Sequence, residues 1–122
     1  MSEQARNIKT YVSAWNESSE DAIEQALAGC VTSDVRYCDP FKDEIQGVDA
    51  LARVMNEVNQ DFPGVVHELV GEPLIHHNTG TYDWLVRMAD GKEIPGVDYV
   101  EFGSDGRISR VVSFTKEADW AP

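Results

Sequence analysis

The chain has 122 residues, of which 42% are hydrophobic and 26% charged, a composition typical of globular proteins. Its 22 acidic and 10 basic side chains give a formal net charge of −12, which argues against nucleic acid or an anionic membrane surface as a partner. The length suits one domain over residues 1–122, and no apolar run is long enough to span a membrane. Cys30 and Cys38 are the two cysteines and no apolar leader precedes Ala5, so we expect free thiols and a cytoplasmic protein.

Apolar side chains recur at helical spacing in three segments of the first half of the chain. The three stripes are Ile8, Tyr11, Val12 and Trp15; Ile23, Ala26, Leu27 and Cys30; and Val48, Leu51, Ala52, Met55, Val58 and Phe62. Ser18 or Ser19 is the expected N-cap of the second helix. Gly47 opens the third helix, and Pro63-Gly64 ends it.

Strand patterns occupy most of the remaining sequence. Residues 34–40 alternate with Val35, Tyr37 and Asp39 on one face. From Val65 onward, turn residues at 78–80, 90–91 and 105–106 separate further strands. These are expected at 65–77, with a bend at Gly71 and Pro73, and near 81–89, 93–103 and 107–115. Helices followed by antiparallel strands predict an α+β fold in which the sheet wraps around the helices.

Asp98 lies in the middle of the strand-forming segment GVDYVEF, among side chains that read as buried. An ionised carboxylate in such surroundings is costly, so its pKa should rise and the group should stay protonated near neutral pH. A neutral acid in a dry pocket can donate a hydrogen bond to a substrate oxygen on which negative charge develops. The alternative is a hydrogen bond to a neighbouring strand or to Tyr11 that only stabilises the core.

The order of the elements, the segment GVDYVEFGSDGRISRVVSFT and the segment YCDP followed by a glycine and a helix together resemble a known family. The chain is similar, from about Ile8 to Thr115, to the NTF2-like superfamily, in the branch of SnoaL-like proteins and ketosteroid isomerases. The resemblance implies a cone-shaped, cystatin-like fold. In it three N-terminal helices pack on a curved, mostly antiparallel sheet around an internal pocket.

The resemblance also implies roles for three residues. Asp39 matches the general base that moves a proton between two carbons next to an enone, and Asp98 matches the protonated acid of the oxyanion hole. Tyr11 lies about where the hydroxyl partner of that acid is found, although Trp15 could occupy the place instead. Asp39 before Pro40 could also merely end a strand, since Asp-Pro commonly opens a turn.

The sequence departs from the family pattern at three positions. Val31 and Met55 stand where well-studied isomerases have further tyrosines, so the hydroxyl network would be less pre-organised. Ser113 stands where limonene epoxide hydrolases need an acid, and we set that chemistry aside.

Strand alternation with Asp98 facing inward predicts a mostly apolar pocket that suits a small hydrophobic ring compound or a polyketide-like molecule. The expected ligand-binding residues are Trp15, Tyr37, Met55, Tyr82, Trp84, Val86, Val100, Val111 and Ser113. The same side chains could instead fill the cone or contact a dimer partner. Val112 and Phe114 on the outer face of the sheet predict a homodimer.

No motif for a cofactor or metal is found. Adjacent strand residues point to opposite faces, so His76 and His77 should not bind one metal together, and His67 is isolated. Two functions remain open: a cofactor-free acid–base enzyme, either an isomerase or a polyketide cyclase-like enzyme, and a non-catalytic module that binds a small apolar ligand or a protein partner.

Overall fold

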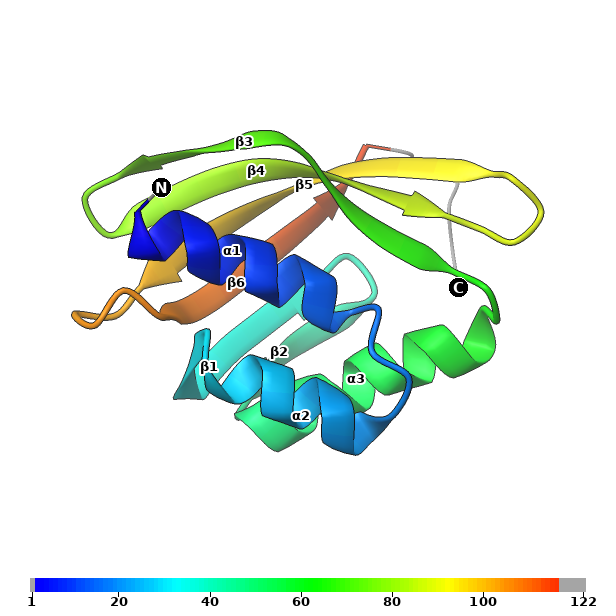
Figure 1. Cartoon of the computed structure of the whole chain (residues 1–122), viewed down its shortest axis with the longest axis horizontal. Helices are drawn as coiled ribbons and strands as arrows, with labels where there is room; N and C mark the ends of the chain where they lie inside the picture. The colour runs from blue at the N-terminus through cyan, green and yellow to red at the C-terminus, as the bar shows by residue number, and fades with distance from the viewer. Residues whose placement is uncertain (1, 117–122) are drawn as a thin grey trace.

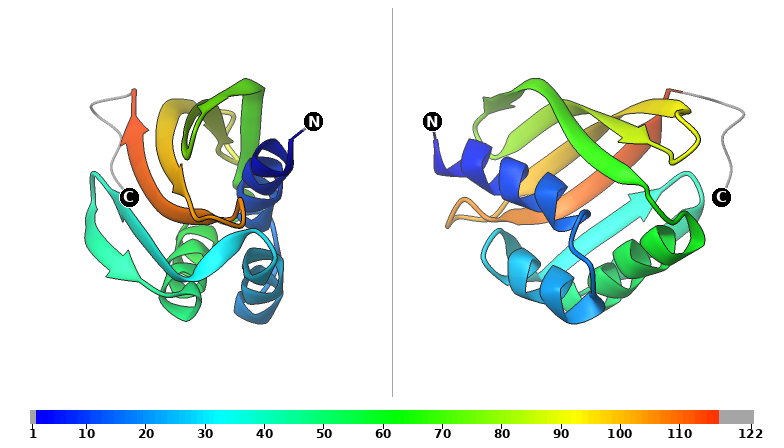
Figure 2. Two further views of the ribbon diagram at one scale, coloured as in Figure 1. Left: turned by 90° about the vertical axis from the view of Figure 1, so that its left-hand side faces the viewer. Right: turned by 45° about the vertical axis from the view of Figure 1, so that its right-hand side comes forward.

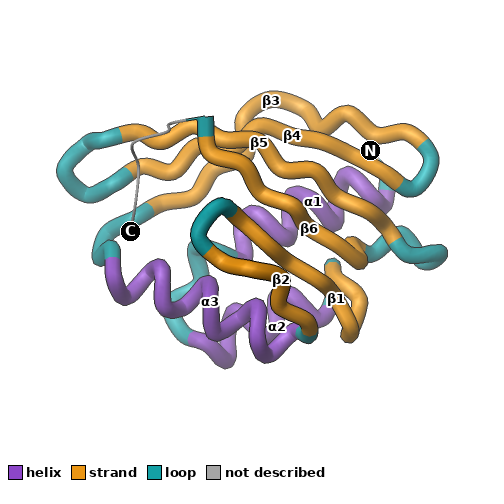
Figure 3. The backbone as a smooth tube through the Cα atoms, turned by 180° about the vertical axis from the view of Figure 1, so that it is seen from behind, coloured by secondary structure: helices purple, strands orange, loops and turns teal. Residues whose placement is uncertain are grey.

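The computed structural model describes residues 2–116, which form three helices and six strands. In chain order the elements are α1 (Glu3–Ala14), α2 (Glu20–Ala28), β1 (Val31–Asp39), β2 (Lys42–Gln46), α3 (Val48–Asp61), β3 (Val66–His76), β4 (Thr79–Arg87), β5 (Glu93–Phe102) and β6 (Ile108–Thr115). The strands form one sheet in the order β2-β1-β6-β5-β4-β3. Among the strands of residues 2–116, only the β1–β6 pair is parallel. Figure 3 shows the strands of this sheet from behind. The predicted α+β fold, with helices on a curved and mostly antiparallel sheet, is confirmed (Figure 1).

The curvature of the sheet creates the space inside the fold. Gly71 has φ +70, and the pairing of β3 with β4 changes register between Val70 and Leu74, so β3 bends where the sequence predicted. Seen end on, the sheet curls over α1, while α2 and α3 lie together beside β1 (Figure 2). The concave face is therefore covered by helices along part of its length.

The helices begin where capping chemistry places them. Ser2 accepts a hydrogen bond from the backbone N–H of Ala5 at the start of α1, and Ser19 does the same for Ala22 at the start of α2. Of the two serines considered for the second helix, Ser19 is thus the cap. Gly47 precedes α3 with φ +103, a backbone conformation that favours glycine.

Three details differ from the sequence-based expectation. The sequence does not predict β2, a short strand at the edge of the sheet. Its residues Lys42, Asp43 and Glu44 are all polar and exposed, so the segment lacks the alternation of apolar and polar side chains that indicates a strand. β1 begins at Val31, before the expected start at residue 34. The β3–β4 turn consists of His77 and Asn78 alone, since residues 79 and 80 already belong to β4, and His77 adopts φ +53.

The hydrophobic core fills the space between the helices and the concave face of the sheet. Its fully buried side chains include Ile8, Ile23, Leu27, Leu51 and Ile108. Within residues 2–116, no helix combines the length and apolar character needed to cross a bilayer.

Candidate functional site

A cavity of about 130 Å³ lies between the concave face of the sheet and helices α1 and α3. Its wall is mostly apolar. Nine of the twelve residues predicted for the site line it: Tyr11, Trp15, Tyr37, Asp39, Tyr82, Trp84, Val86, Asp98 and Ser113. Strand alternation therefore identified one wall of the cavity before any tertiary contact was known.

Met55, Val100 and Val111 do not line the cavity, which corrects our expectation for these three residues. All three are fully buried in the hydrophobic core. Val100 pairs with Val111 at a part of the concave face that the helices cover, and Met55 belongs to the buried face of α3 together with Leu51. The cavity is instead bordered by a different stripe of α3, namely Val54, Val58 and Phe62.

Several lining residues were not predicted as ligand contacts. Besides the α3 stripe they are Val12, Pro40, Phe41, Lys42, Val65, His67, Leu85, Met88 and Thr115. For Met88 and Thr115 the signal was present, because alternation places them on the same faces as Val86 and Ser113. Alternation also places His67 on the same face as Val65, but a single histidine in a strand does not by itself indicate a site.

Asp98 is buried, at 5% exposure, and both of its carboxylate oxygens accept hydrogen bonds. The Tyr82 hydroxyl donates to Oδ2 at 2.6 Å, and the Trp84 indole Nε1–H donates to Oδ1 at 2.7 Å. The register of the sheet explains these contacts, because Tyr82 and Ser113 lie directly opposite Asp98 on the two neighbouring strands. Tyr82, rather than Tyr11, is therefore the hydroxyl that contacts this carboxyl.

The pKa of Asp98 is raised to about 6, above that of an ordinary aspartate. Burial is the main cause, and the negative charge of Asp39 adds to it. Hydrogen bonding by Ser113, Tyr82 and Trp84 favours the charged form and opposes the rise. The direction matches our expectation, but with a pKa of about 6 the carboxyl is mostly ionised at pH 7 rather than protonated.

The Tyr11 hydroxyl is buried and has no hydrogen-bond partner among the described residues. Burial and the nearby charge of Asp98 raise its pKa well above that of an ordinary tyrosine, while the Trp15 indole acts in the opposite direction. Tyr11 is therefore a neutral phenol, and its side chain lines the cavity. An unpaired buried hydroxyl is costly, so this group is a candidate for an interaction that the described residues do not supply.

Asp39 lies at the end of β1, where its carboxylate holds the β1–β2 turn. Oδ1 accepts hydrogen bonds from the backbone N–H groups of Phe41 and Lys42, both at 2.8 Å. Oδ2 accepts a hydrogen bond from the Tyr37 hydroxyl at 2.7 Å. The turn-forming role that Asp-Pro allowed is thus realised, and Asp39 also borders the cavity.

His67 lies on the inner face of β3, where its ring stacks on Trp15 with centroids 4.9 Å apart. Its Nε2 is 3.1 Å from Oδ1 of Asn59. Burial lowers the pKa of His67 to about 4, so the ring is neutral at pH 7. The cavity thus contains a neutral imidazole, although the sequence pattern does not single out His67.

Within residues 2–116, no group of three or more His, Cys, Asp or Glu side chains is arranged to hold a metal ion. The expectation that His76 and His77 point apart is wrong, because His77 lies in the turn rather than in the strand. Their Nδ1 atoms are 3.2 Å apart. With an unpaired phenol, two carboxylates and apolar walls, the cavity has the groups needed to bind a carbonyl oxygen and to accept a proton.

Comparison with known proteins places this geometry in context. A family model described as a SnoaL-like domain matches residues 8–111, whereas no curated protein matches the chain. A solved structure from Agrobacterium tumefaciens strain C58, provisionally named an isomerase of the SnoaL-like family, matches with a TM-score of 0.86 and 29% identity. The match covers 96% of this chain and 100% of that one.

Two more distant structures share the fold. A protein from Jannaschia sp. CCS1, provisionally named a SnoaL-like polyketide cyclase, matches with a TM-score of 0.72 and 14% identity over 91% of this chain and 85% of that one. An NTF2-like protein of unknown function from Exiguobacterium sp. 255-15 matches with a TM-score of 0.72 and 18% identity over 92% of this chain and 99% of that one.

Proposed function

The chain belongs to the SnoaL-like domain family, and from this premise we propose that it binds a small apolar ketone in the cavity and moves a proton on it without a cofactor. Isomerisation of an unsaturated ketone and ring closure of a polyketide both begin by removing a proton from a carbon beside a carbonyl. The two provisional names among the similar structures, isomerase and polyketide cyclase, are compatible with this one step.

The observation that carries the proposal is the unpaired Tyr11 hydroxyl on the wall of the same apolar cavity as Asp98. In this proposal Tyr11 donates a hydrogen bond to the ketone oxygen and stabilises the negative charge that develops there when the proton leaves. A fixed donor on a mostly apolar cavity wall is worth more than the same donor in solution. Because the pKa of Tyr11 is raised, the phenol keeps its proton. Tyr11 therefore donates a hydrogen bond in this proposal and does not transfer its proton to the ketone.

The resemblance to ketosteroid isomerases assigns the base to Asp39 and a donor role to Asp98, but the hydrogen bonds favour another division. Asp98 accepts hydrogen bonds from Tyr82 and Trp84, and its pKa of about 6 makes it a stronger base than an ordinary carboxylate. The oxygens of Asp39 hold the β1–β2 turn and Tyr37. We therefore propose Asp98 as the base, with the isomerase-type division as the alternative.

The size of the cavity narrows the ligand class. An engineered cavity of about 150 Å³ holds one benzene molecule, so a cavity of about 130 Å³ suits one ring rather than the four rings of a steroid. This supports a monocyclic ketone, or one ring of a larger molecule whose remainder stays outside.

The test is the conversion of cyclohex-3-enone to cyclohex-2-enone, followed by the ultraviolet absorbance of the conjugated product. Asp98→Asn should abolish the enzymatic rate, because the amide cannot accept the proton. Tyr11→Phe should lower the rate by roughly 10²–10³, the usual cost of one oxyanion donor. Asp39→Asn keeps an oxygen for the turn N–H groups and should retain most of the activity.

Asp83→Asn is the matched control, because it removes an exposed carboxylate from β4 next to Trp84. If Asp39→Asn abolishes the rate and Asp98→Asn does not, the isomerase-type division replaces ours. If the wild type binds the enone but does not convert it, the protein is a non-catalytic ligand-binding module. One observation favours the non-catalytic function: both carboxylate oxygens of Asp98 already accept hydrogen bonds from side chains of the protein.

A further inference from the structure

His67 is held in one orientation by contacts from two other elements. The side chain of Asn16 forms two hydrogen bonds with its backbone: Asn16 Oδ1 accepts from the His67 N–H and Asn16 Nδ2 donates to the His67 carbonyl, each at 2.8 Å. Trp15, which directly follows α1, packs against the ring with the two ring centroids 4.9 Å apart. The imidazole therefore borders the cavity in a position that is set before any ligand binds.

The contact with Asn59 determines which ring nitrogen carries the proton. Asn59 Nδ2 donates to the Trp15 carbonyl at 2.6 Å, so the amide must present its oxygen to His67. That oxygen can only accept, and it lies 3.1 Å from Nε2 of His67. Nε2 is therefore the protonated nitrogen of the neutral ring, and Nδ1 is left with a lone pair.

His67 and Asp98 lie at different ends of the cavity. On β4, Tyr82 is opposite Asp98 and Val86 is opposite His67, four residues farther along the strand. At about 3.3 Å per residue this separation is about 13 Å along the strand. The hydrogen-bond donor Tyr11 accompanies Asp98 at one end, and the acceptor Nδ1 belongs to the other.

We propose that Nδ1 of His67 is a ligand-binding acceptor that selects ketones carrying a hydroxyl or N–H group at the end opposite the carbonyl. The inference rests on the proposed function, because it takes the carbonyl to be held at Tyr11. His67 touches the ligand but takes no part in moving the proton. A mostly apolar cavity that offers a donor near Asp98 and an acceptor near His67 distinguishes ligands by the polarity of both ends.

Three probes of similar shape test this selection: acetophenone, 4-methoxyacetophenone and 4-hydroxyacetophenone. All three carry the ketone, and only the last has a donor at the opposite end. Wild-type protein should bind the hydroxy compound about 3- to 10-fold more tightly than the methoxy compound, the value of one net hydrogen bond. Quenching of tryptophan fluorescence can follow binding, since Trp15 and Trp84 border the cavity.

His67→Phe keeps an aromatic ring beside Trp15 and removes the acceptor, so it should bind the hydroxy and methoxy compounds equally. Tyr11→Phe is the matched variant at the other end. It should weaken binding of all three ketones while leaving the ratio of hydroxy to methoxy compound unchanged. The two variants thus separate recognition of the carbonyl from recognition of the donor.

A measurement on the wild-type protein tests the role of His67 even if the His67→Phe variant does not fold. The ¹⁵N chemical shifts of His67 should show a protonated Nε2 and an unprotonated Nδ1, and the Nδ1 shift should move with the hydroxy compound but not with the methoxy compound. Equal binding of these two compounds, or a proton on Nδ1 in the free protein, overturns this inference and leaves the proposed function standing. If none of the three ketones binds at millimolar concentration, the proposed function fails and this inference fails with it.

Discussion

Asp98 is a buried and His67 a partly buried ionisable side chain, and for both of them burial favours the neutral form. The pKa of Asp98 is raised to about 6 and that of His67 is lowered to about 4. Between pH 4 and 6 folded Asp98 binds more protons than it does when unfolded, so its contribution to stability is lost as pH rises. Between pH 4 and 6.5 folded His67 binds fewer protons, so its contribution is lost as pH falls. The two effects oppose each other over nearly the same range.

We therefore predict that the free energy of unfolding depends more steeply on pH in each single variant than in the wild type, where the two effects cancel. Relative to the double variant Asp98→Asn/His67→Phe, the free energy of unfolding of Asp98→Asn should rise by roughly 2–3 kcal/mol between pH 4 and 7, because only His67 titrates. That of His67→Phe should fall by a similar amount, because only Asp98 titrates. Urea unfolding at several pH values measures both. Parallel curves for the two single variants would contradict the assignment.

At the scale of elements, the β4–β5 ladder sets the chemistry of Asp98. Trp84 lies opposite Gly96, and its ring occupies the space that a side chain at Gly96 would need. A Cβ placed there would come within 1.9 Å of the indole. The absence of a side chain at residue 96 is thus what lets the Trp84 N–H reach Asp98, two residues farther along β5.

Gly96→Ala should displace the Trp84 indole and remove a hydrogen bond that favours ionised Asp98, so the pKa of Asp98 should rise above about 6. The added methyl group should also destabilise the fold by about 1–3 kcal/mol. The ¹³C shift of the Asp98 carboxyl against pH gives the pKa. Trp84→Phe is the control that removes the N–H while keeping an aromatic ring, and it should raise the pKa as well. An unchanged titration in both variants would show that the indole does not tune this carboxyl.

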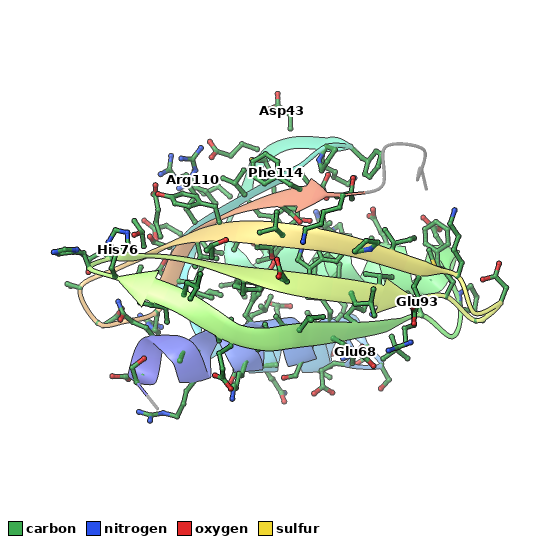
Figure 4. All side chains as sticks on the ribbon, turned by 90° about the horizontal axis from the view of Figure 1, so that it is seen from above. Asp43, Glu68, His76, Glu93, Arg110 and Phe114 are labelled. Atoms are coloured by element: carbon green, nitrogen blue, oxygen red, sulfur yellow. The ribbon has the colours of Figure 1, made fainter. Side chains whose placement is uncertain are left out.

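At the scale of the whole molecule, the outer face of the sheet carries exposed apolar side chains on β3 and β6. Leu74 is 71% exposed and Phe114 50% exposed, and Val66 and Val70 are also exposed. Figure 4 looks onto this face and shows Phe114 on β6, with Arg110 farther along the same strand. We propose, as the sequence suggested, that a second copy of the chain covers part of this face.

Sedimentation at micromolar concentration should therefore show a dimer for the wild type. A monomer is expected for Leu74→Lys combined with Phe114→Lys, because two buried charges would oppose association. Gln25→Lys, an added charge at an exposed position of α2, should leave the dimer intact. A monomeric wild type would rule out the proposed assembly while leaving the cavity and its ligand unaffected.

Local patterns in the sequence determined which residues face inward. In a strand the side-chain period is two, so the inward direction of Asp98 follows from its neighbours in β5, and Tyr82, Trp84 and Val86 follow from one another in β4. Capping by Ser19 and the turn at Asp39-Pro40 are equally local, since each hydrogen bond spans only two or three residues. Such features need no knowledge of the distant chain.

Only the tertiary structure decided which of these inward residues meet. Tyr82 rather than Tyr11 contacts Asp98 because of the register between β4 and β5, and no local pattern specifies a register. His67 acquires its orientation and its proton position from Asn16 and Asn59, and Asn16 is 51 residues away. Met55, Val100 and Val111 follow the inward pattern yet lie in the core, because the helices cover that part of the sheet. Direction is a property of one strand or helix, whereas contact and burial depend on how the elements pack together.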